Sequence, residues 1–255
     1  STATQGMYNV TIGDGTTTYT DGMFLDSAKV WNDLILNGNT ASPASTSVQM
    51  RTGGVEIGGD LTITNASFLQ YSTNAYALTV GGDVTLNADG VLNLSNGGTQ
   101  SFGSLTINTD GTYDATSGTT TITSHSSNWV INNDGGTFTH NNGLVHSTQT
   151  AVNNAKIDMD GDSLYDLQFT THPRSTKIES TTTIANDFTL TSGYFSTGSD
   201  RTLTVTGDVL LTSGVFYGNA SAVSFGSLTI SSGGQYSATS GVTKMSAGGT
   251  FSDGG

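Results

Sequence analysis

The chain has 255 residues, with 7 Lys and Arg against 20 Asp and Glu, which gives a formal net charge of −13. So few cations argue against nucleic acid or anionic membranes as partners, and no run of 18 or more apolar residues offers a membrane span. Because the chain has no Cys, disulfides, thiolate zinc sites and Cys nucleophiles are excluded.

One short pattern recurs along the chain. It consists of a small or aromatic residue, then Gly or Asn, then Asp or Ser, and then an apolar-x-apolar strand. In chain order the copies begin at Met7, Trp31, Gly58, Gly81, Phe102, Leu164, Ala185, Thr206 and Phe225. The spacings are 24, 27, 23, 21, 62, 21, 21 and 19 residues. We interpret the gap of 62 as three periods of about 21.

Each copy predicts a polar turn followed by a strand whose apolar side chains alternate with Thr. A second short strand usually follows, as at Leu78-Thr-Val80 and Leu203-Thr-Val205. Two or three short strands per 19–27 residues are typical of one coil of a β-solenoid. The chain is therefore expected to be all-β, with about 10–12 coils. The 45 Thr would occupy strand faces, and the 34 Gly would occupy corners.

The short pattern is itself part of a longer sequence repeat. Residues 102–118 recur as residues 225–241, an offset of 123, and Gly82-Asp-Val84 recurs as Gly207-Asp-Val209, an offset of 125. We therefore divide the chain into two repeat blocks, residues 1–135 and 136–255, within one continuous rod. Gly249-Thr-Phe251 repeats the opening of the second block, Gly136-Thr-Phe138. This repetition predicts continuation into a longer array or into a neighbouring copy, end to end.

Segments such as Leu78-Thr-Val-Gly-Gly-Asp-Val-Thr-Leu86 and Gly111-Thr-Tyr-Asp-Ala-Thr-Ser-Gly-Thr-Thr-Thr-Ile122 resemble the β-strand repeats of large secreted prokaryotic surface proteins. Such repeats occur in the passenger stalks of autotransporters and in filamentous-haemagglutinin-like adhesins. The resemblance covers nearly the whole chain, apart from residues 125–163, which fit the pattern poorly. It implies a right-handed parallel β-helix at the cell surface, and it supplies no catalytic residues.

The densest acidic cluster is Asp158, Asp160 and Asp162 around Gly161. Carboxylates are the hard oxygen ligands that Ca²⁺ prefers, so these three are the candidate metal ligands. However, the glycine comes one position too early for the familiar D-x-D-x-D-G loop, and no Glu follows at the expected place. The alternative is an ordinary turn between coils. No other cofactor is expected.

Other chemistry-bearing residues are sparse. The single Asp of each Gly-Asp corner (Asp60, Asp83, Asp208) is interpreted as a turn former, because stacked carboxylates would repel one another. His125, His140, His146 and His172 form no specific metal pattern. Glu56 and Glu179 are the only Glu, and Arg51, Arg174 and Arg201 are far apart, so no catalytic set is predicted.

Aromatic side chains give a further clue. Two groups are close in sequence: Phe68, Tyr71 and Tyr76, and Tyr194, Phe195, Phe216 and Tyr217. They would stack on sugars, form a subunit contact or close the core between coils. Residues 38–54 and 125–163 lengthen the pattern, and we expect any specific binding surface there.

Taken together, the sequence predicts an extracellular structural protein, a β-solenoid module of a surface filament, stalk or adhesin. Its partners would be copies of itself or adjacent repeats, with a glycan or cell-surface molecule as a further candidate. Two alternatives stay open. One is a viral or phage fibre that binds host glycans. The other is a polysaccharide-degrading β-helix enzyme, which would need clustered carboxylates.

Overall fold

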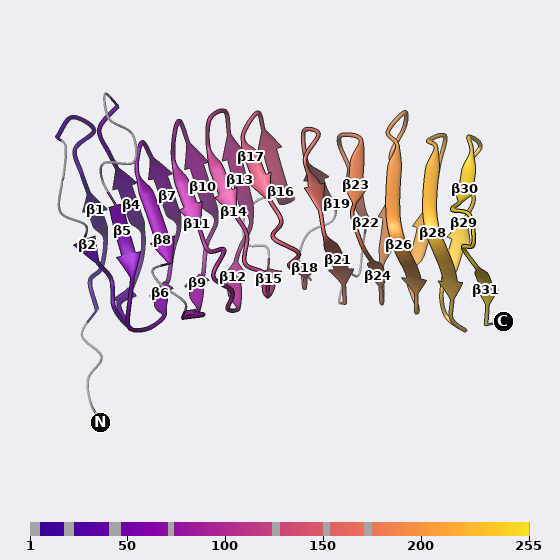
Figure 1. The fold of residues 1–255 in the computed structure, drawn as a ribbon, viewed down its shortest axis with the longest axis horizontal. Coiled ribbons are helices and arrows are strands. Elements are labelled where there is room, and N and C mark those ends of the chain that lie inside the picture. The colour runs from indigo at the N-terminus through magenta and orange to yellow at the C-terminus, as the bar shows by residue number, and fades with distance from the viewer. Residues whose placement is uncertain are drawn as a thin grey trace.

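The computed structural model describes residues 6–17, 23–40, 47–70 (backbone only at 69 and 70), 74–123, 128–149, 154–170 and 175–254. Within these residues all the regular elements are β-strands, and they stack into a rod-shaped parallel β-solenoid of about ten coils (Figure 1). At the usual strand spacing, ten coils give a rod about 50 Å long. No helix among the described residues is long and apolar enough to span a membrane.

Each coil contributes one strand to each of three faces. The first face contains β3 (Lys29–Val30), β6 (Val55–Ile57), β9 (Leu78–Val80), β12 (Gln100–Phe102), β15 (Thr119–Ile122), β18 (Leu144–Ser147), β21 (Asp166–Phe169), β24 (Phe188–Leu190), the second halves of β26 (Leu203–Leu211) and β28 (Val223–Ile230), and β31 (Phe251–Asp253).

The second face contains β1 (Val10–Ile12), β4 (Leu34–Asn37), β7 (Leu61–Thr64), β10 (Val84–Asn87), β13 (Leu105–Asn108), β16 (Trp129–Asp134), β19 (Asn154–Asp158), β22 (Ser175–Ile178), β25 (Tyr194–Ser196), β27 (Val215–Tyr217) and β29 (Gln235–Ser237).

The third face has two parts. The first part contains β2 (Met23–Phe24), β5 (Ser47–Met50), β8 (Ser67–Gln70), β11 (Val91–Asn93), β14 (Thr112–Asp114) and β17 (Thr137–Thr139). The second part contains β20 (Ser163–Leu164), β23 (Thr182–Ile184), the first halves of β26 and β28, and β30 (Thr243–Met245). Because β26 and β28 run through a corner without a break, this second part joins the first face into one 14-stranded sheet.

The strand register confirms the predicted period. Val10 pairs with Leu34, Leu34 with Leu61, Leu61 with Val84, and Val84 with Leu105. These pairs reproduce the sequence spacings of 24, 27, 23 and 21. In the second half, Phe188 pairs with Val209 and Val209 with Leu228, which reproduces the spacings of 21 and 19. The sequence period is therefore the length of one coil.

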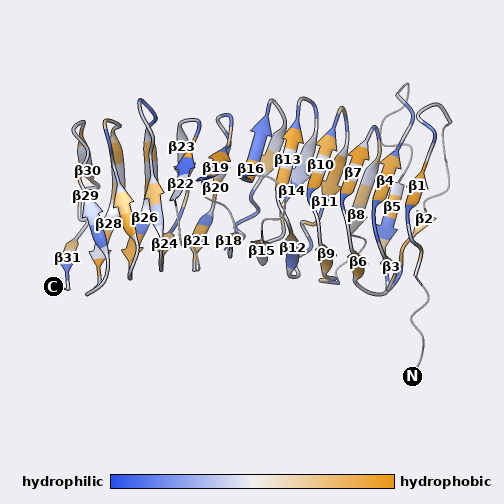
Figure 2. Ribbon diagram, turned by 180° about the vertical axis from the view of Figure 1, so that it is seen from behind, coloured by the Kyte–Doolittle hydropathy of each residue, from blue (hydrophilic) through white to orange (hydrophobic). Residues whose placement is uncertain are grey.

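Alternation within each strand builds the core. In β10, Val84 and Leu86 are fully buried while Thr85 lies on the outer side, and β7 repeats this arrangement with Leu61 and Ile63. Apolar residues accordingly recur along the strands of successive coils, with hydrophilic residues between them (Figure 2). Each coil buries only a few side chains, and its neighbours above and below complete the core.

The second half of the rod has an aromatic column inside it. Five fully buried rings pack against one another with centroid distances of 4.8–6.2 Å: Phe169, Phe188, Phe195, Phe216 and Phe225. Such ring pairs add to the free energy of burial itself. For Phe195 and Phe216, whose role the sequence left open, the structure shows that they are core residues.

The two repeat blocks do not use the same faces, which corrects the interpretation of the 62-residue gap. Phe102 lies on the first face and Leu105 on the second, whereas in the second copy Phe225 lies on the third face and Leu228 on the first. The gap of 62 therefore covers two coils and two faces, not three coils. The second block is shifted by one face, a third of a turn, relative to the first.

The shift occurs within residues 125–163, the stretch that fitted the pattern poorly. Their described parts still form strands of the rod, β16 to β20. The register slips at β16, between Trp129 and Ile131, and no ladder is described between β17 and β20 on the third face. Because all three faces have the same in–out alternation, a motif fits whichever corner it reaches.

Candidate functional site

The Gly-Asp corners form ladders along the rod. In the first block, an Asp33 carboxylate oxygen accepts the backbone N–H of Asp60 at 2.9 Å, and Asp60 in turn accepts the N–H of Asp83 at 2.8 Å. In the second block, Asp166 accepts the N–H of Asp187 and Asp187 accepts that of Asp208, at 2.9 and 2.8 Å. Each carboxylate thus binds a backbone donor of the next coil.

These ladders show why the corner residues stack despite their charge. One carboxylate oxygen in each of Asp33, Asp60, Asp166 and Asp187 accepts a backbone N–H, so an attractive contact accompanies the repulsion between stacked acids. Asp60, Asp83 and Asp208 therefore lie in the turns at the corners of the coils, as the sequence indicated. Among the described residues, no group of three or more His, Asp or Glu is arranged to hold a metal ion.

The candidate calcium ligands lie in the turn between β19 and β20. Asp162 Oδ2 accepts the N–H of Phe138 at 2.6 Å and the Asn133 side-chain amide at 3.0 Å, while Asp160 Oδ2 accepts the N–H of Gly135 at 3.1 Å. Asp158 Oδ1 accepts the N–H of Asp160 at 3.1 Å. The three carboxylates are therefore directed to separate donors and do not converge, and a calcium site here stays a prediction.

The described histidines also have ordinary partners. His140 Nδ1 accepts the N–H of Asn142 at 3.0 Å, and its ring packs 5.4 Å from that of Tyr165. His146 Nε2 contacts the Thr170 hydroxyl at 2.8 Å, and partial burial lowers the pKa of His146. His125 and His172 lie outside the described residues, as do Arg174 and Tyr71.

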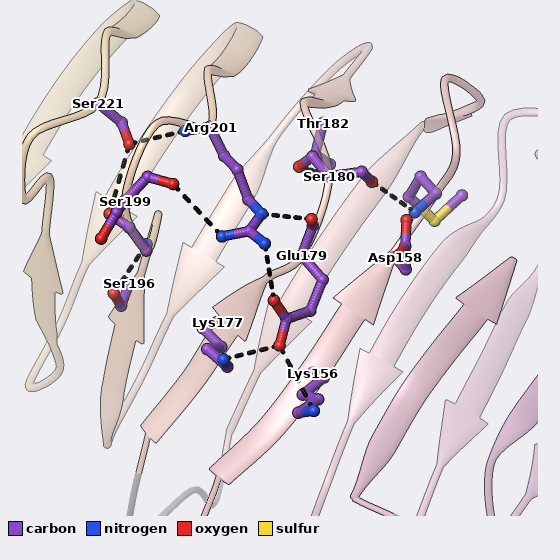
Figure 3. A network of polar contacts seen from close by, with 12 residues as sticks. Lys156, Asp158, Lys177, Glu179, Ser180, Thr182, Ser196, Ser199, Arg201 and Ser221 are labelled. Carbon is purple, nitrogen blue, oxygen red and sulfur yellow. Dashed lines mark hydrogen bonds and ion pairs between the residues drawn. The ribbon is translucent and has the colours of Figure 1, made fainter. Parts of the chain in front are cut away.

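Among the described residues, the densest charged cluster centres on Glu179, which sequence reasoning did not single out (Figure 3). Its carboxylate contacts Lys177 Nζ at 2.7 Å, Arg201 Nη2 at 3.1 Å and Lys156 Nζ at 3.5 Å. The Arg201 guanidinium also donates to the Glu179 and Ser199 carbonyl oxygens. Because Lys156, Lys177 and Arg201 come from three consecutive coils, the cluster ties those coils together.

The cluster also sets the charge state of Glu179. Partial burial raises the pKa of its carboxyl, but the Lys177 hydrogen bond and the charges of Lys177, Lys156 and Arg201 outweigh burial, so the pKa is lowered from its ordinary value. Glu179 is thus a carboxylate held by cations, which is unlike a general acid whose pKa is raised. The other Glu, Glu56, pairs with Lys29 on the first face.

Two pairs of exposed aromatic residues lie at separate places on the rod. Tyr194 and Tyr217 lie side by side on the second face, with ring centroids 6.0 Å apart and nearly parallel planes, and both are about two-fifths exposed. At the N-terminal end, Tyr8 and Trp31 are exposed, and Lys29 lies over the Trp31 ring. Phe68 is buried in the core, and Tyr76 packs against it.

Two shallow hollows lie on the first face. The larger, of about 530 Å³, lies over β3, β6 and β9 and is lined by Ser27, Ala28, Lys29, Gly54, Val55, Glu56, Ala77 and Thr79. The smaller, of about 280 Å³, lies beside the corner carboxylates Asp187 and Asp208. The larger hollow is lined by small side chains and by the Lys29–Glu56 ion pair. The smaller is lined by Asp, Thr and aliphatic side chains.

Comparison with protein-family models, with curated proteins and with solved structures finds no match to this chain. The assignment of function therefore rests on the residues and on the geometry.

The coil period of about 21 residues would have revealed the Glu179 cluster from the sequence. Lys156 and Lys177 are 21 residues apart, which is one coil, so they pair directly in neighbouring strands. Glu179 and Arg201 are 22 residues apart, again about one coil. Charges separated by one period are neighbours in a solenoid, however far apart they look in the sequence.

Proposed function

We propose that the chain is a rigid β-solenoid rod, a module of an extracellular filament, stalk or cell-surface adhesin. The observation that carries this proposal is the parallel pairing that runs without a break along the second face from β1 to β29 and along the first face from β3 to β31, which builds an extended rod along one axis (Figure 1). Rigid spacing is what such an architecture supplies best, because each coil contacts only its neighbours.

We further propose that coil stacking continues past the C-terminal coil, into adjacent repeats or into a second copy. Phe251 is 62% exposed, whereas the residue with which it pairs, Leu228, is 1% exposed. Val242 is also exposed. A further coil would bury these side chains and pair the open strand edge, which is otherwise prone to association.

A concentration series tests the end-to-end contact. Electron microscopy and sedimentation of the purified chain should show rods whose lengths are multiples of about 50 Å, with longer rods at higher concentration. Phe251→Asp should shorten them to single units, whereas Thr106→Asp on a side face should not. Single rods at every concentration would refute self-association and leave continuation within a longer chain as the surviving form.

We also propose that the chain is not an enzyme. The support is that four corner carboxylates bind backbone donors and that both Glu side chains are paired with cations. The test is a panel of polysaccharide substrates. Degradation that disappears in a Glu179→Gln variant with an unchanged fold would overturn this part of the proposal.

A further inference from the structure

A row of outward-facing side chains runs along the second face, parallel to the rod axis. The register places Trp129, Lys156, Lys177, Ser196 and Tyr217 in consecutive coils. With about 4.8 Å between neighbouring strands, the row is about 19 Å long. It therefore has an aromatic ring at each end and two lysines between them.

A second row lies beside the first and widens this surface. It consists of Asn154, Ser175 and Tyr194, which pair in consecutive coils. The Ser175 hydroxyl donates to the Asn154 side-chain oxygen at 3.0 Å, and the Tyr194 ring stacks against Tyr217. Amide, hydroxyl and aromatic groups on a flat face offer hydrogen bonds together with apolar contact area, which a sugar ring with polar edges and an apolar face requires.

The charge of this surface differs from that of the chain. The cluster of Figure 3 contains Lys156, Lys177 and Arg201 against Glu179 and Asp158, a local charge of +1, whereas the chain has −13. Three of the chain's seven cations gather here. Each ammonium group has three donors. The side chains of Lys156 and Lys177 are 33% and 42% exposed, whereas that of Glu179 is 14% exposed. At physiological salt, carboxylates farther than about 8 Å are largely screened.

We propose that this surface binds an acidic polysaccharide lying along the rod axis. Its carboxylate or sulfate groups contact Lys156 and Lys177, and its sugar faces pack on Trp129, Tyr194 and Tyr217. A nucleic acid fits less well, because it carries a phosphate on every nucleotide and the rod as a whole is strongly acidic. The surface is on the side of the rod, so binding is independent of end-to-end stacking.

Titration of the purified chain with defined glycans tests the ligand class. Polygalacturonate oligosaccharides and heparin oligosaccharides represent the carboxylate and sulfate sources, neutral dextran oligosaccharides are the uncharged control, and single-stranded DNA is the polyanion control. We expect binding of one or both acidic glycans that weakens as NaCl rises from 50 to 200 mM, and little binding of dextran or DNA. Equal binding of dextran, tighter binding of DNA, or no binding of either acidic glycan would overturn the proposal.

Matched variants test the location of the site. Lys156→Gln with Lys177→Gln, and separately Tyr194→Ala with Tyr217→Ala, should each weaken acidic-glycan binding about tenfold or more. Lys29→Gln and Tyr8→Ala remove a paired lysine and an exposed tyrosine at the other end of the rod, and they should leave affinity unchanged. Thermal melting identifies any variant that loses its fold, and Lys177→Gln alone then replaces the double variant. Equal losses in the control variants would place the site elsewhere and refute the assignment.

Discussion

Gly81 lies at a corner where the backbones of two neighbouring coils approach each other closely. A Cβ atom at this position would lie 2.4 Å from the carbonyl oxygen of Gly58. Because that oxygen belongs to the backbone, the coils themselves must move apart to accept a side chain. The close approach thus explains a glycine whose own φ angle is unexceptional.

We therefore expect Gly81→Ala to destabilise the rod by about 1–3 kcal/mol, the usual cost of overpacking. Urea unfolding followed by circular dichroism measures the change. Thr62→Val, which keeps a β-branched residue on a side face, is the control and should stay within about 0.5 kcal/mol of the parent. An Ala variant as stable as the parent would show that the two coils move apart at this corner at little cost in free energy.

Glu179 gives a prediction with a defined pH dependence. Its pKa in the fold is lower than the ordinary value of 4.5, so its stabilising contribution is present above about pH 4.5. The contribution is lost as the pH falls through the lower folded value. The lysines and the arginine around it are partly exposed, which limits the contribution to about 1 kcal/mol.

Glu179→Gln should accordingly lower the free energy of unfolding at pH 7, and the difference from the parent should shrink as the pH falls below about 4.5. Urea titrations at pH 7 and at pH 3 measure this difference. A deficit of the same size at pH 3 and pH 7 would mean that packing, and not charge, stabilises this corner.

At the scale of elements, the Asp ladders connect coil to coil. Asp60 has one clear task, which is to accept the N–H of Asp83. Asp60→Ala removes the acceptor and should cost about 0.5–1.5 kcal/mol, whereas Asp60→Asn keeps an acceptor oxygen and should cost less. Thermal melting of the two variants side by side makes the comparison. Equal losses would indicate that the charge, and not the acceptor, matters.

The aromatic column makes a larger contribution inside the second block. Phe195 is fully buried and contacts the rings of Phe169, Phe188 and Phe216. Phe195→Ala should cost about 3–5 kcal/mol through lost burial and the cavity that remains. Phe195→Leu keeps much of the volume and should cost less than about 1.5 kcal/mol. Denaturant unfolding distinguishes the two, and similar small losses would show that the core collapses around the gap.

At the scale of the whole molecule, stability should vary along the rod. Each coil is stabilised by the coils above and below, so interior coils have two such contacts and a terminal coil has one. Hydrogen exchange should therefore be slowest in interior strands such as β10 and β13 and fastest in β29, β30 and β31. Mass spectrometry of timed exchange measures this gradient. Uniform protection would indicate all-or-none cooperativity instead.

Much of this architecture could be predicted from the sequence. Repeated apolar-x-apolar strands revealed the coil period, since Val84 and Leu105 pair at the spacing that the repeat predicts. The face on which each motif lies could not be predicted, because the same alternation suits all three faces. The Glu179 cluster was also missed, since its residues are close only after whole coil lengths are added.

The one-face shift between the blocks has a geometrical consequence for arrays of such units. If every further block repeated the same offset, its surface features would point 120° away from those of the block before it. A binding row like that of Lys156 and Lys177 would face the same direction again only in every third block. Such an array would present its surfaces around the whole circumference of the rod and not along one side. It could therefore engage ligands approaching from any direction.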